Sequence, residues 1–184
     1  IIANAFQNCK YLAVADVNEA QKIHEMLPQA KLVIIYQPLY REIFEIVENN
    51  YIPAVSDIEF AKLLNKEALL QNKIISIHVE IDTGHRRLGI NTKEVKNFAR
   101  ELLKLNNIKV EGIFTHYVCA DTSEETDFNF TQLQTDLFSK AVNEFEEVYG
   151  IVKYKHSCAG AGIFNKKANH FNMVRPGYIL YGYY

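Results

Sequence analysis

Arginine and glycine residues follow two apolar, β-type runs of this sequence, and these residues could hold an anion. The first run, His78–Asp82, leads into Thr-Gly-His-Arg-Arg-Leu-Gly, and the second is Met173-Val-Arg-Pro-Gly-Tyr178. An arginine in such a place can bind a phenolate, carboxylate or phosphate through its planar fork of donors. Because loops at the carboxyl ends of strands reach the ligand in α/β proteins, the two runs predict one shared site.

Arg87 is the arginine of the first run that we favour for ligand binding, since two glycines bracket it. For Arg86 or Arg87 taken alone, an ion pair at the surface is the simpler interpretation. Glu80 lies on the preceding strand, and a carboxylate inside a sheet is costly without a cation beside it. We therefore expect Glu80 to accompany Arg87, although a strand-edge position facing solvent stays open.

His116 and His156 each end an apolar run, where both a catalytic and a buried structural histidine are reasonable interpretations. Gly160 and Gly177 follow the last two runs and could let backbone amides approach an anion closely. Turns of this kind hold phosphate in many barrels, but short glycine turns are also common. The six histidines show no metal-ligand spacing, and no Ser/His/Asp arrangement is evident, so no metal site is predicted.

Seven strand-like segments, nearly all separated by helices, must position these residues. The expected strands span 10–16, 31–36, 51–56, 73–81, 110–116, 152–156 and 173–181. The expected helices span 17–26, 38–49, 58–70, 92–105 and 130–148. Pro38 suits the first turn of one helix, Asp57 can cap the next, and Asn91 or Thr92 can cap another. Nearly continuous hydrophobicity along the strands indicates a parallel sheet that is covered on both faces.

The number of strands favours an α/β protein with a (β/α)8 TIM-type barrel that lacks its first strand. An open doubly wound sheet would usually have a glycine-rich turn after its first strand, whereas Ala15-Asp-Val-Asn-Glu19 stands here. GxGxxG and P-loop motifs are absent from the sequence. No linker-like segment divides the 184 residues, so one domain is expected.

Composition points to an ordinary globular protein, with 48% hydrophobic and 23% charged residues and a net charge of -2. This charge gives no reason to expect nucleic acid or an anionic membrane as a partner. No apolar stretch approaches the roughly 20 residues that span a bilayer, and no signal peptide is evident. Three widely spaced cysteines indicate reduced thiols in a cytoplasmic protein. The first residue is not Met, which is typical of a fragment.

Three segments together resemble the pyridoxal-phosphate barrel domain of the alanine racemase family. Asp82–Gly89 matches the family signature DTGMxRxG, and Glu111–His116 matches its strand that ends in Ser-His or Thr-His. Phe171–Gly182 closely matches FDxVRPGIxLYG, a long and specific motif. Ala120-Asp121, Gln134 and Phe138 also fit. The motifs occur in the family's order, and the resemblance covers essentially the whole chain.

The resemblance implies a role for each matching residue toward pyridoxal 5′-phosphate. Arg175 would face the pyridine nitrogen and keep it unprotonated, which favours racemisation over transamination in the family. His116 would lie against the pyridine ring. Arg87 would bond the phenolic oxygen of the cofactor and approach the carboxylate of a small amino-acid substrate. The phosphate would be held by the amides of Gly177 and Tyr178 and the turn at Gly160.

Three residues of the site depart from the family pattern. Gly160, in the turn that begins at His156, replaces a serine whose hydroxyl usually holds phosphate, a loss of about 1.5 to 3 kcal/mol. His85 replaces the usual Met beside the cofactor. Glu80 stands where several members have a lysine that becomes carbamylated and balances the arginine corresponding to Arg87. We expect Glu80 to supply that negative charge directly.

Two catalytic residues of the family have no counterpart in this sequence. The Schiff-base lysine belongs to the first barrel strand, expected just upstream of residue 1. The tyrosine belongs to a C-terminal β domain, expected after residue 184 and acting across a homodimer. Residues 1–184 would then form the pyridoxal-phosphate-binding barrel domain, inactive alone. The intact protein would be a cytoplasmic isomerase that interconverts L- and D-alanine and supplies D-alanine for peptidoglycan.

Other functions stay open at this stage. Serine is an alternative substrate, because the pocket wall and the second domain are outside the sequence. A non-catalytic pyridoxal-phosphate carrier of related fold is a second alternative, but such carriers generally lack the VRPG…LYG motif. A degenerate barrel that binds no cofactor and serves as an interaction domain is a third.

Overall fold

The computed structural model describes residue 6 and residues 8–122, 124–165 and 168–182. The chain forms two compact units. One contains the residues up to His78 together with Lys104–Val110, and the other contains Val79–Leu103 and the residues from Glu111 onward. Two long strands contribute to both units: β4 (Ile75–Asp82) and β6 (Ile108–Phe114).

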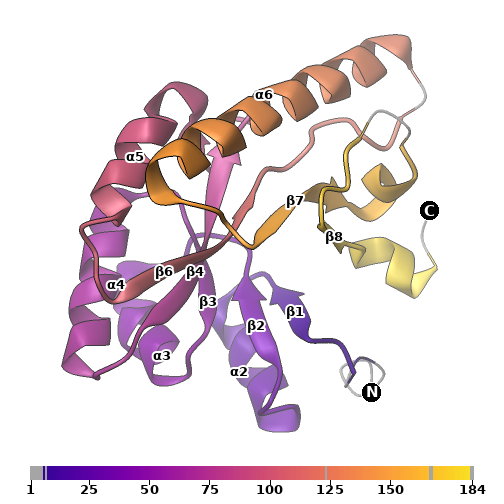
Figure 1. The fold of residues 1–184 in the computed structure, drawn as a ribbon. Coiled ribbons are helices and arrows are strands. Elements are labelled where there is room, and N and C mark those ends of the chain that lie inside the picture. The colour runs from indigo at the N-terminus through magenta and orange to yellow at the C-terminus, as the bar shows by residue number, and fades with distance from the viewer. Residues whose placement is uncertain (1–5, 7, 123, 166–167, 183–184) are drawn as a thin grey trace. The chain divides into compact units, whose positions relative to one another are not determined.

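The first unit repeats a strand-helix pattern. Its strands β1 (Tyr11–Val14), β2 (Lys31–Ile34) and β3 (Ile52–Val55) pair in parallel in chain order, and β4 follows β3 in the sheet. The intervening helices are α2 (Val17–Met26), α3 (Ile43–Glu48) and α4 (Ile58–Leu70), with a short 3-10 helix η1 (Tyr40–Glu42) before α3. Helices α3 and α4 pack side by side (Figure 1). Parallel strands joined by helices are the pattern that the sequence predicts.

The second unit continues the alternation and carries every residue predicted for the site. Its sheet order is β4-β6-β7-β8, and β5 (Ile90–Asn91) pairs with the end of β4. Strands β7 (Tyr154–Ala159) and β8 (Met173–Arg175) extend the parallel sheet from β6. Helix α5 (Val95–Leu102) packs along α6 (Glu125–Tyr149) (Figure 1). The remaining elements are the 3-10 helices η2 (Thr92–Glu94), η3 (Gly160–Phe164) and η4 (Gly177–Tyr181).

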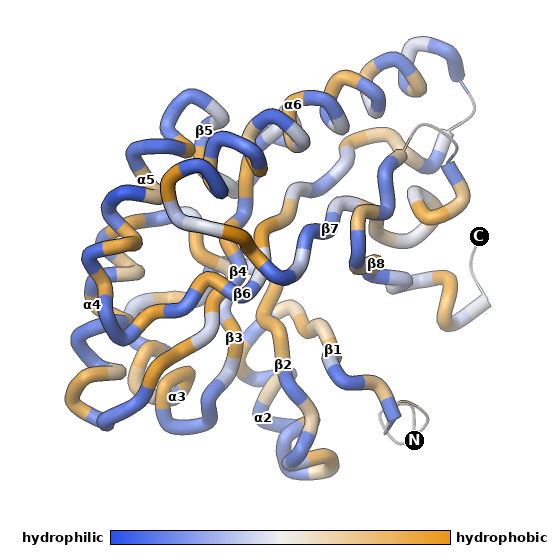
Figure 2. Tube along the Cα trace, viewed as in Figure 1, coloured by the Kyte–Doolittle hydropathy of each residue, from blue (hydrophilic) through white to orange (hydrophobic). Residues whose placement is uncertain are grey.

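Apolar strands form the core of each unit. All four residues of β3 are buried, and β4 buries Ile75, Ile77, Val79 and Ile81 almost completely. Hydrophobic residues follow one another along β2 and β3, whereas the helices alternate hydrophobic and hydrophilic residues (Figure 2). For β3 and β4 the pattern confirms strands that are covered on both faces, with amphipathic helices as the cover. For β1 and β8, most residues are half-buried or exposed, so the prediction is wrong there.

Local sequence signals set several helix ends. The Asp57 side chain accepts a hydrogen bond from the Glu59 amide (2.9 Å), and Asn91 accepts one from the Lys93 amide (3.0 Å), as predicted for both caps. The prediction that a helix begins at Pro38 is wrong. Residue Leu39 is extended, and its amide donates to the Glu42 carboxylate (2.8 Å), so the helical turn begins at Tyr40.

The prediction of a strand over 173–181 is wrong beyond Arg175. Pro176 has helical torsion angles and lacks a backbone N–H, and Gly177 has φ +48°, so the chain turns into η4. Helix α6 begins at Glu125, five residues earlier than predicted. Acidic residues in its first turn stabilise the helix N-terminus, even though this turn lacks the apolar pattern that predicts a helix.

The three cysteines, Cys9, Cys119 and Cys158, are free thiols, as the sequence predicts. Among the described residues, no helix is both long and apolar enough to cross a bilayer.

Candidate functional site

Arg175, at the end of β8, is held by three partners in the second unit. Its Nη2 donates to the backbone oxygens of Thr115 (3.0 Å) and Ser157 (3.1 Å), and its Nη1 contacts Nδ1 of His156. A guanidinium can only donate, so Nδ1 of His156 accepts and the proton of a neutral His156 ring lies on Nε2. Burial lowers the pKa of Arg175 to about 10, which leaves the side chain charged at neutral pH.

Aromatic rings complete the support of Arg175. The Phe114 and His156 rings stack with centroids 4.8 Å apart and planes 3° from parallel. The guanidinium carbon of Arg175 lies 5.3 Å from the Phe114 centroid, within the range of a cation-π contact. The strands β6, β7 and β8 therefore fix one permanent positive charge in one orientation.

Glu80, on β4, is the buried carboxylate of this site, with 5% of its surface exposed. Burial raises its pKa to about 7, although the positive charges of Arg87 and Arg175 act in the opposite direction. Its Oε2 atom has no hydrogen-bond partner among the described residues. Glu80 is thus near two arginines, as predicted for Arg87, but it is only about half ionised at neutral pH in this arrangement.

His116 follows β6, and its ring packs edge-to-face against His85, with centroids 5.1 Å apart. Burial lowers the pKa of His116 to about 4, and the charges of Arg175 and Arg87 act in the same direction. At neutral pH the imidazole is therefore uncharged, flat and able to stack on an aromatic ligand. Nδ1 of His85 is buried, and no residue that the structure describes forms a hydrogen bond with it.

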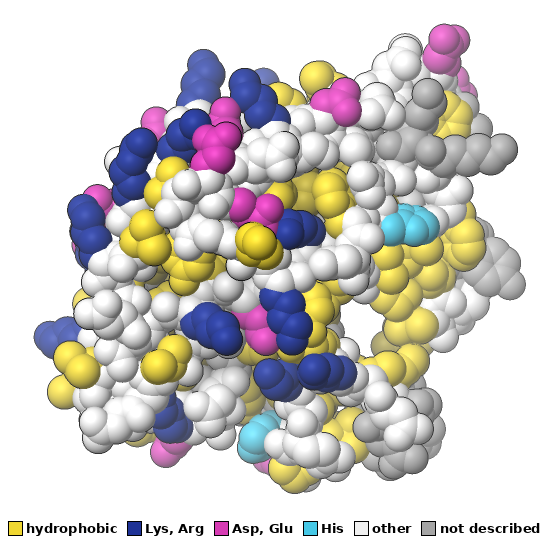
Figure 3. Space-filling view, in the orientation of Figure 1, with side chains coloured by type: hydrophobic (Ala, Val, Ile, Leu, Met, Phe, Trp, Pro, Cys, Tyr) yellow, Lys and Arg dark blue, Asp and Glu magenta, His cyan; other side chains and the backbone are white. Residues whose placement is uncertain are grey.

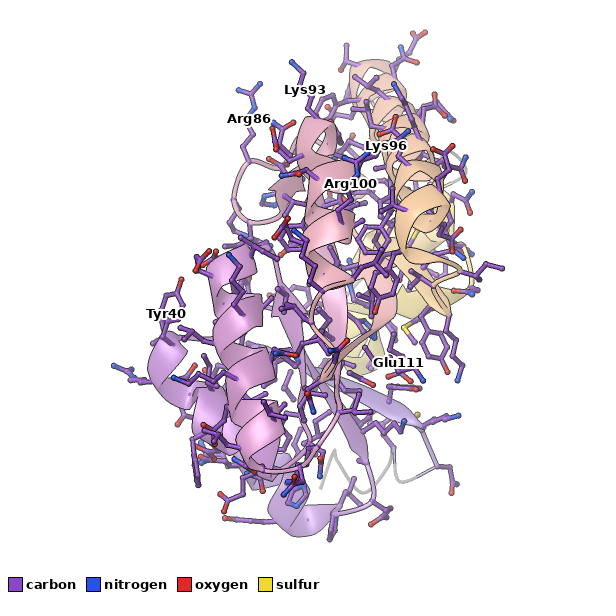
Figure 4. The ribbon with its side chains drawn as sticks, turned by 60° about the vertical axis from the view of Figure 1, so that its left-hand side comes forward. Tyr40, Arg86, Lys93, Lys96, Arg100 and Glu111 are labelled. Atoms are coloured by element: carbon purple, nitrogen blue, oxygen red, sulfur yellow. The ribbon has the colours of Figure 1, made fainter. Side chains whose placement is uncertain are left out.

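The loop after β4 is shaped by Asp82 and by glycine. Oδ1 of Asp82 accepts from the amides of Gly84 (2.9 Å) and Arg86 (3.0 Å). Gly89 has φ +107°, and a Cβ there would lie 2.5 Å from the Asp82 amide nitrogen. Both arginines of this loop are exposed. Arg86 points into solvent (Figure 4), whereas Arg87 acts electrostatically on both Glu80 and His116.

A cavity of about 680 Å³ lies beside these residues, between the segments that follow β6 and β7. Gly160 and Tyr178 line it, together with His116. A Cβ added at Gly160 (φ +46°) or at Gly177 (φ +48°) would have no described atom within 4 Å, so the backbone of each residue is open to a ligand. Hydrophobic side chains gather over β8 and η4 (Figure 3), where 77% of Tyr178 is exposed.

A buried polar network lies beneath the site. The sequence analysis predicts no role for it. The hydroxyls of Thr83 and Thr115 are 2.8 Å apart, and Nε2 of Gln134 donates to Thr83 (3.1 Å). Each threonine stands one residue beyond its strand, in Asp-Thr-Gly and Phe-Thr-His. That shared position is the signal that could have identified the pair.

Known proteins resemble the chain along its whole length. Residues 1–184 match the family model described as alanine racemase, N-terminal domain. The chain belongs to the alanine racemase family. Alanine racemases of Treponema denticola and Methanococcus maripaludis are 31% and 34% identical to it. In both comparisons 94% of this chain is covered, but only 46% of the relative, so the chain spans about half the length of these relatives.

Solved structures of alanine racemases show the same fold. The enzyme of Clostridium difficile 630 matches with a TM-score of 0.91 and 27% identity, covering 100% of this chain and 48% of that one. The structure from Bartonella henselae with covalently bound pyridoxal phosphate matches with a TM-score of 0.82 and 20% identity, covering 99% of this chain and 51% of that one. The likeness confirms the predicted fold class, a (β/α)8 TIM-type barrel lacking its first strand.

The alanine racemase motifs come together as the sequence predicts. Arg175 and Arg87 both act on Glu80, and His156 contacts Arg175 directly. Strand register places Ala159 opposite Arg175, and Ala159 also lines the cavity. Gly160, Tyr178 and His116 share that cavity, with His85 packed on His116. Among the described residues, no group of three or more His, Cys, Asp or Glu side chains could hold a metal ion.

Proposed function

We propose that this chain is the cofactor-binding domain of a pyridoxal-phosphate-dependent racemase that interconverts L- and D-alanine. The observation that carries the proposal is the fixed guanidinium of Arg175, with two of its donors satisfied by backbone oxygens and its charge retained. An aromatic nitrogen that faces such a donor accepts a hydrogen bond and stays unprotonated. Membership of the alanine racemase family supports alanine as the substrate.

The residues present fit pyridoxal phosphate. The neutral His116 ring offers a face for the pyridine ring, and the cavity that it lines extends to Gly160. The open backbones at Gly160 and Gly177 suit a phosphate, which needs amide donors at close range. Gly160 lacks the serine hydroxyl of the family, so the backbone amides of Gly177 and Tyr178 would hold more of the phosphate.

Each residue would have a distinct task around the bound cofactor. Pyridoxal phosphate withdraws electrons from the amino acid attached to it and so acidifies the α-proton. Arg87 would bind the phenolic oxygen of the cofactor and orient the substrate carboxylate. Arg175 would limit electron withdrawal by holding the ring nitrogen unprotonated, which favours return of the proton to the α-carbon. The lysine and tyrosine that move this proton in the family are expected outside residues 1–184.

Glu80 would balance the two arginines when the site is occupied. Its pKa of about 7 is set mainly by burial, with Arg87 and Arg175 acting in the opposite direction. Any contraction of the distance between Arg87 and Glu80 on ligand binding would favour the ionised form. We propose that Glu80 carries the negative charge that a carbamylated lysine provides in other members.

The proposal is tested on the product of the native gene. Its mass is measured first: a value near 21.2 kDa would overturn the racemase assignment and leave a binding role. Cofactor uptake is then followed by a visible absorbance band, and racemisation is assayed with alanine and with serine. Arg87→Ala should abolish activity, whereas Arg86→Ala, the matched change at the neighbouring exposed arginine, should not.

The outcomes separate the alternatives. Absorbance without racemisation of either amino acid would indicate a non-catalytic carrier, and the absence of an absorbance band would indicate an interaction domain. Faster turnover of serine than of alanine would identify serine as the substrate. The family resemblance also implies a cytoplasmic homodimer with shared active sites that supplies D-alanine for peptidoglycan, and light scattering of the intact protein tests the dimer.

A further inference from the structure

Gln134, on α6, uses all of its amide hydrogen-bonding groups on the loops that carry the site. It is fully buried. Its Oε1 accepts from the backbone amide of Val118 (3.0 Å), and its Nε2 donates to the backbone oxygen of His116 (3.2 Å). Nε2 also donates its second proton to the Thr83 hydroxyl (3.1 Å). The amide orientation is therefore fixed, because a flipped amide would place donor against donor and acceptor against acceptor.

The contacts to residues 116 and 118 hold the chain just beyond the parallel ladder of β6. Strand β6 ends at Phe114, and its pairing with β7 reaches one residue further, where the Thr115 amide donates to the His156 backbone oxygen (3.1 Å). One primary amide, with one acceptor and one donor, pairs with the Val118 amide and the His116 carbonyl. The backbone at His116 is thus anchored to a helix, and the position of the His116 ring depends on that anchor.

The contact to Thr83 extends the anchor to the loop of Arg87. Thr83 is the first residue after β4, and its hydroxyl also lies 2.8 Å from the Thr115 hydroxyl. Thr83 therefore joins the start of the Asp82–Gly89 loop to both Gln134 and the end of β6. Helix α6 contributes no predicted ligand contact of its own, yet one of its side chains binds both loops.

We propose that Gln134 is a positioning residue that keeps His116 and the Arg87 loop in register, so that both reach one ligand. The proposal rests on the proposed function for the identity of that ligand, pyridoxal phosphate. Gln134 would not touch the ligand. A residue that merely filled the core would change overall stability without a selective effect on these two loops.

Two substitutions distinguish the separate hydrogen bonds. Gln134→Met keeps the length of the side chain but removes every amide contact. Gln134→Glu at pH 8 keeps an acceptor for the Val118 amide but places a carboxylate oxygen against the His116 carbonyl, whereas the Thr83 hydroxyl can turn and donate to the carboxylate. Gln132→Met is the matched control, because Gln132 lies on the same helix and bonds only Asp136 (2.9 Å) at the surface.

Amide hydrogen exchange and NMR titration of His116 are measured on the cofactor-free intact protein. In Gln134→Met, exchange should accelerate at Val118 and in the 83–89 loop, and the His116 pKa should shift. In Gln134→Glu the Val118 amide and the 83–89 loop should stay protected, and only the His116 carbonyl should lose its donor. The control should resemble the wild type. These readouts test the positioning role even if the protein proves not to bind pyridoxal phosphate.

Cofactor affinity is measured in parallel by absorbance titration. Gln134→Met should raise the dissociation constant by about tenfold, in line with the loss of one or two hydrogen bonds from a preorganised site. Uniformly faster exchange throughout the protein, with unchanged His116 titration and an affinity within twofold of the wild type, would overturn the proposal. If Gln134→Met does not fold, Gln134→Glu decides: weaker cofactor binding with a protected Val118 amide supports the proposal, and unchanged binding overturns it.

Discussion

Replacing Glu80 by Gln should change the pH dependence of stability in a defined way. Glu80 is 5% exposed, and burial raises its pKa from 4.5 to about 7 in the folded cofactor-free protein. A carboxyl group with a raised folded-state pKa favours folding when protonated. Its ionisation therefore costs stability as the pH rises from about 4.5 through 7. The substitution Glu80→Gln removes this cost, because the amide stays neutral at every pH.

The size of the effect follows from the shift. Each pKa unit corresponds to about 1.4 kcal/mol, so a rise of roughly 2.5 units corresponds to about 3 kcal/mol once the pH exceeds 7. Near pH 5.5 only about 1.4 kcal/mol should have developed, and below pH 4 nearly none. The advantage of Glu80→Gln over the wild type should therefore grow across this range.

His116 also titrates with a shifted pKa, but it acts in the opposite direction. Its folded pKa of about 4 lies below the usual 6.5, so protonation costs stability as the pH falls below 6.5. This cost is present in both the wild type and Glu80→Gln. The difference between the two stability curves therefore reports Glu80 rather than His116.

Urea unfolding of the cofactor-free protein between pH 4.5 and 8 measures that difference. Glu94→Gln, which removes an exposed carboxylate from η2, controls for the change in net charge. A difference between Glu80→Gln and the wild type that stays constant across this range would refute the reasoning. So would an equal trend in the control.

Three further predictions concern backbone strain and charge. Gly89→Ala should cost about 2–4 kcal/mol in urea unfolding, because its Cβ would meet the Asp82 backbone at 2.5 Å. Gly150→Ala, also at positive φ but with no described atom within 4 Å of the added Cβ, should cost about 1–2 kcal/mol from backbone strain alone, and a cost equal to that of Gly89→Ala would contradict the steric argument. NMR should show His116 uncharged from pH 5.5 to 8. Arg175→Lys should weaken cofactor binding at least tenfold, because lysine lacks the planar fork; unchanged absorbance titration would contradict this.

Strand positions and the gathering of the arginine, histidine and glycine residues at the ends of strands could be predicted because their signals are local. Apolar runs identified seven strands, and the side chains of Asp57 and Asn91 marked two caps. The prediction of a strand beyond Arg175 is wrong because it rests on the apolar residues of the segment. Their hydropathy does not reveal that Pro176 and Gly177 turn the chain into η4.

The pKa of Glu80 depends on residues that are distant from it in the sequence. Glu80 was expected to be a simple counter-charge for Arg87, yet burial outweighs both arginines and brings its pKa to about 7. The balance of burial and charge depends on Arg175, which is 95 residues away along the chain and reaches the site only through β8.

Arg175 shows why a motif alone does not specify a working group. The VRPG motif supplies a guanidinium, but its orientation comes from the backbone oxygen of Thr115, just beyond β6, and from Ser157 and His156 on β7. Those same strands end in the loops that carry His116 and Gly160. A shift of β6 or β7 would therefore move the Arg175 charge, the His116 ring and the Gly160 turn together. Because these groups share their supports, substitutions beneath them should alter binding of the proposed cofactor without touching it.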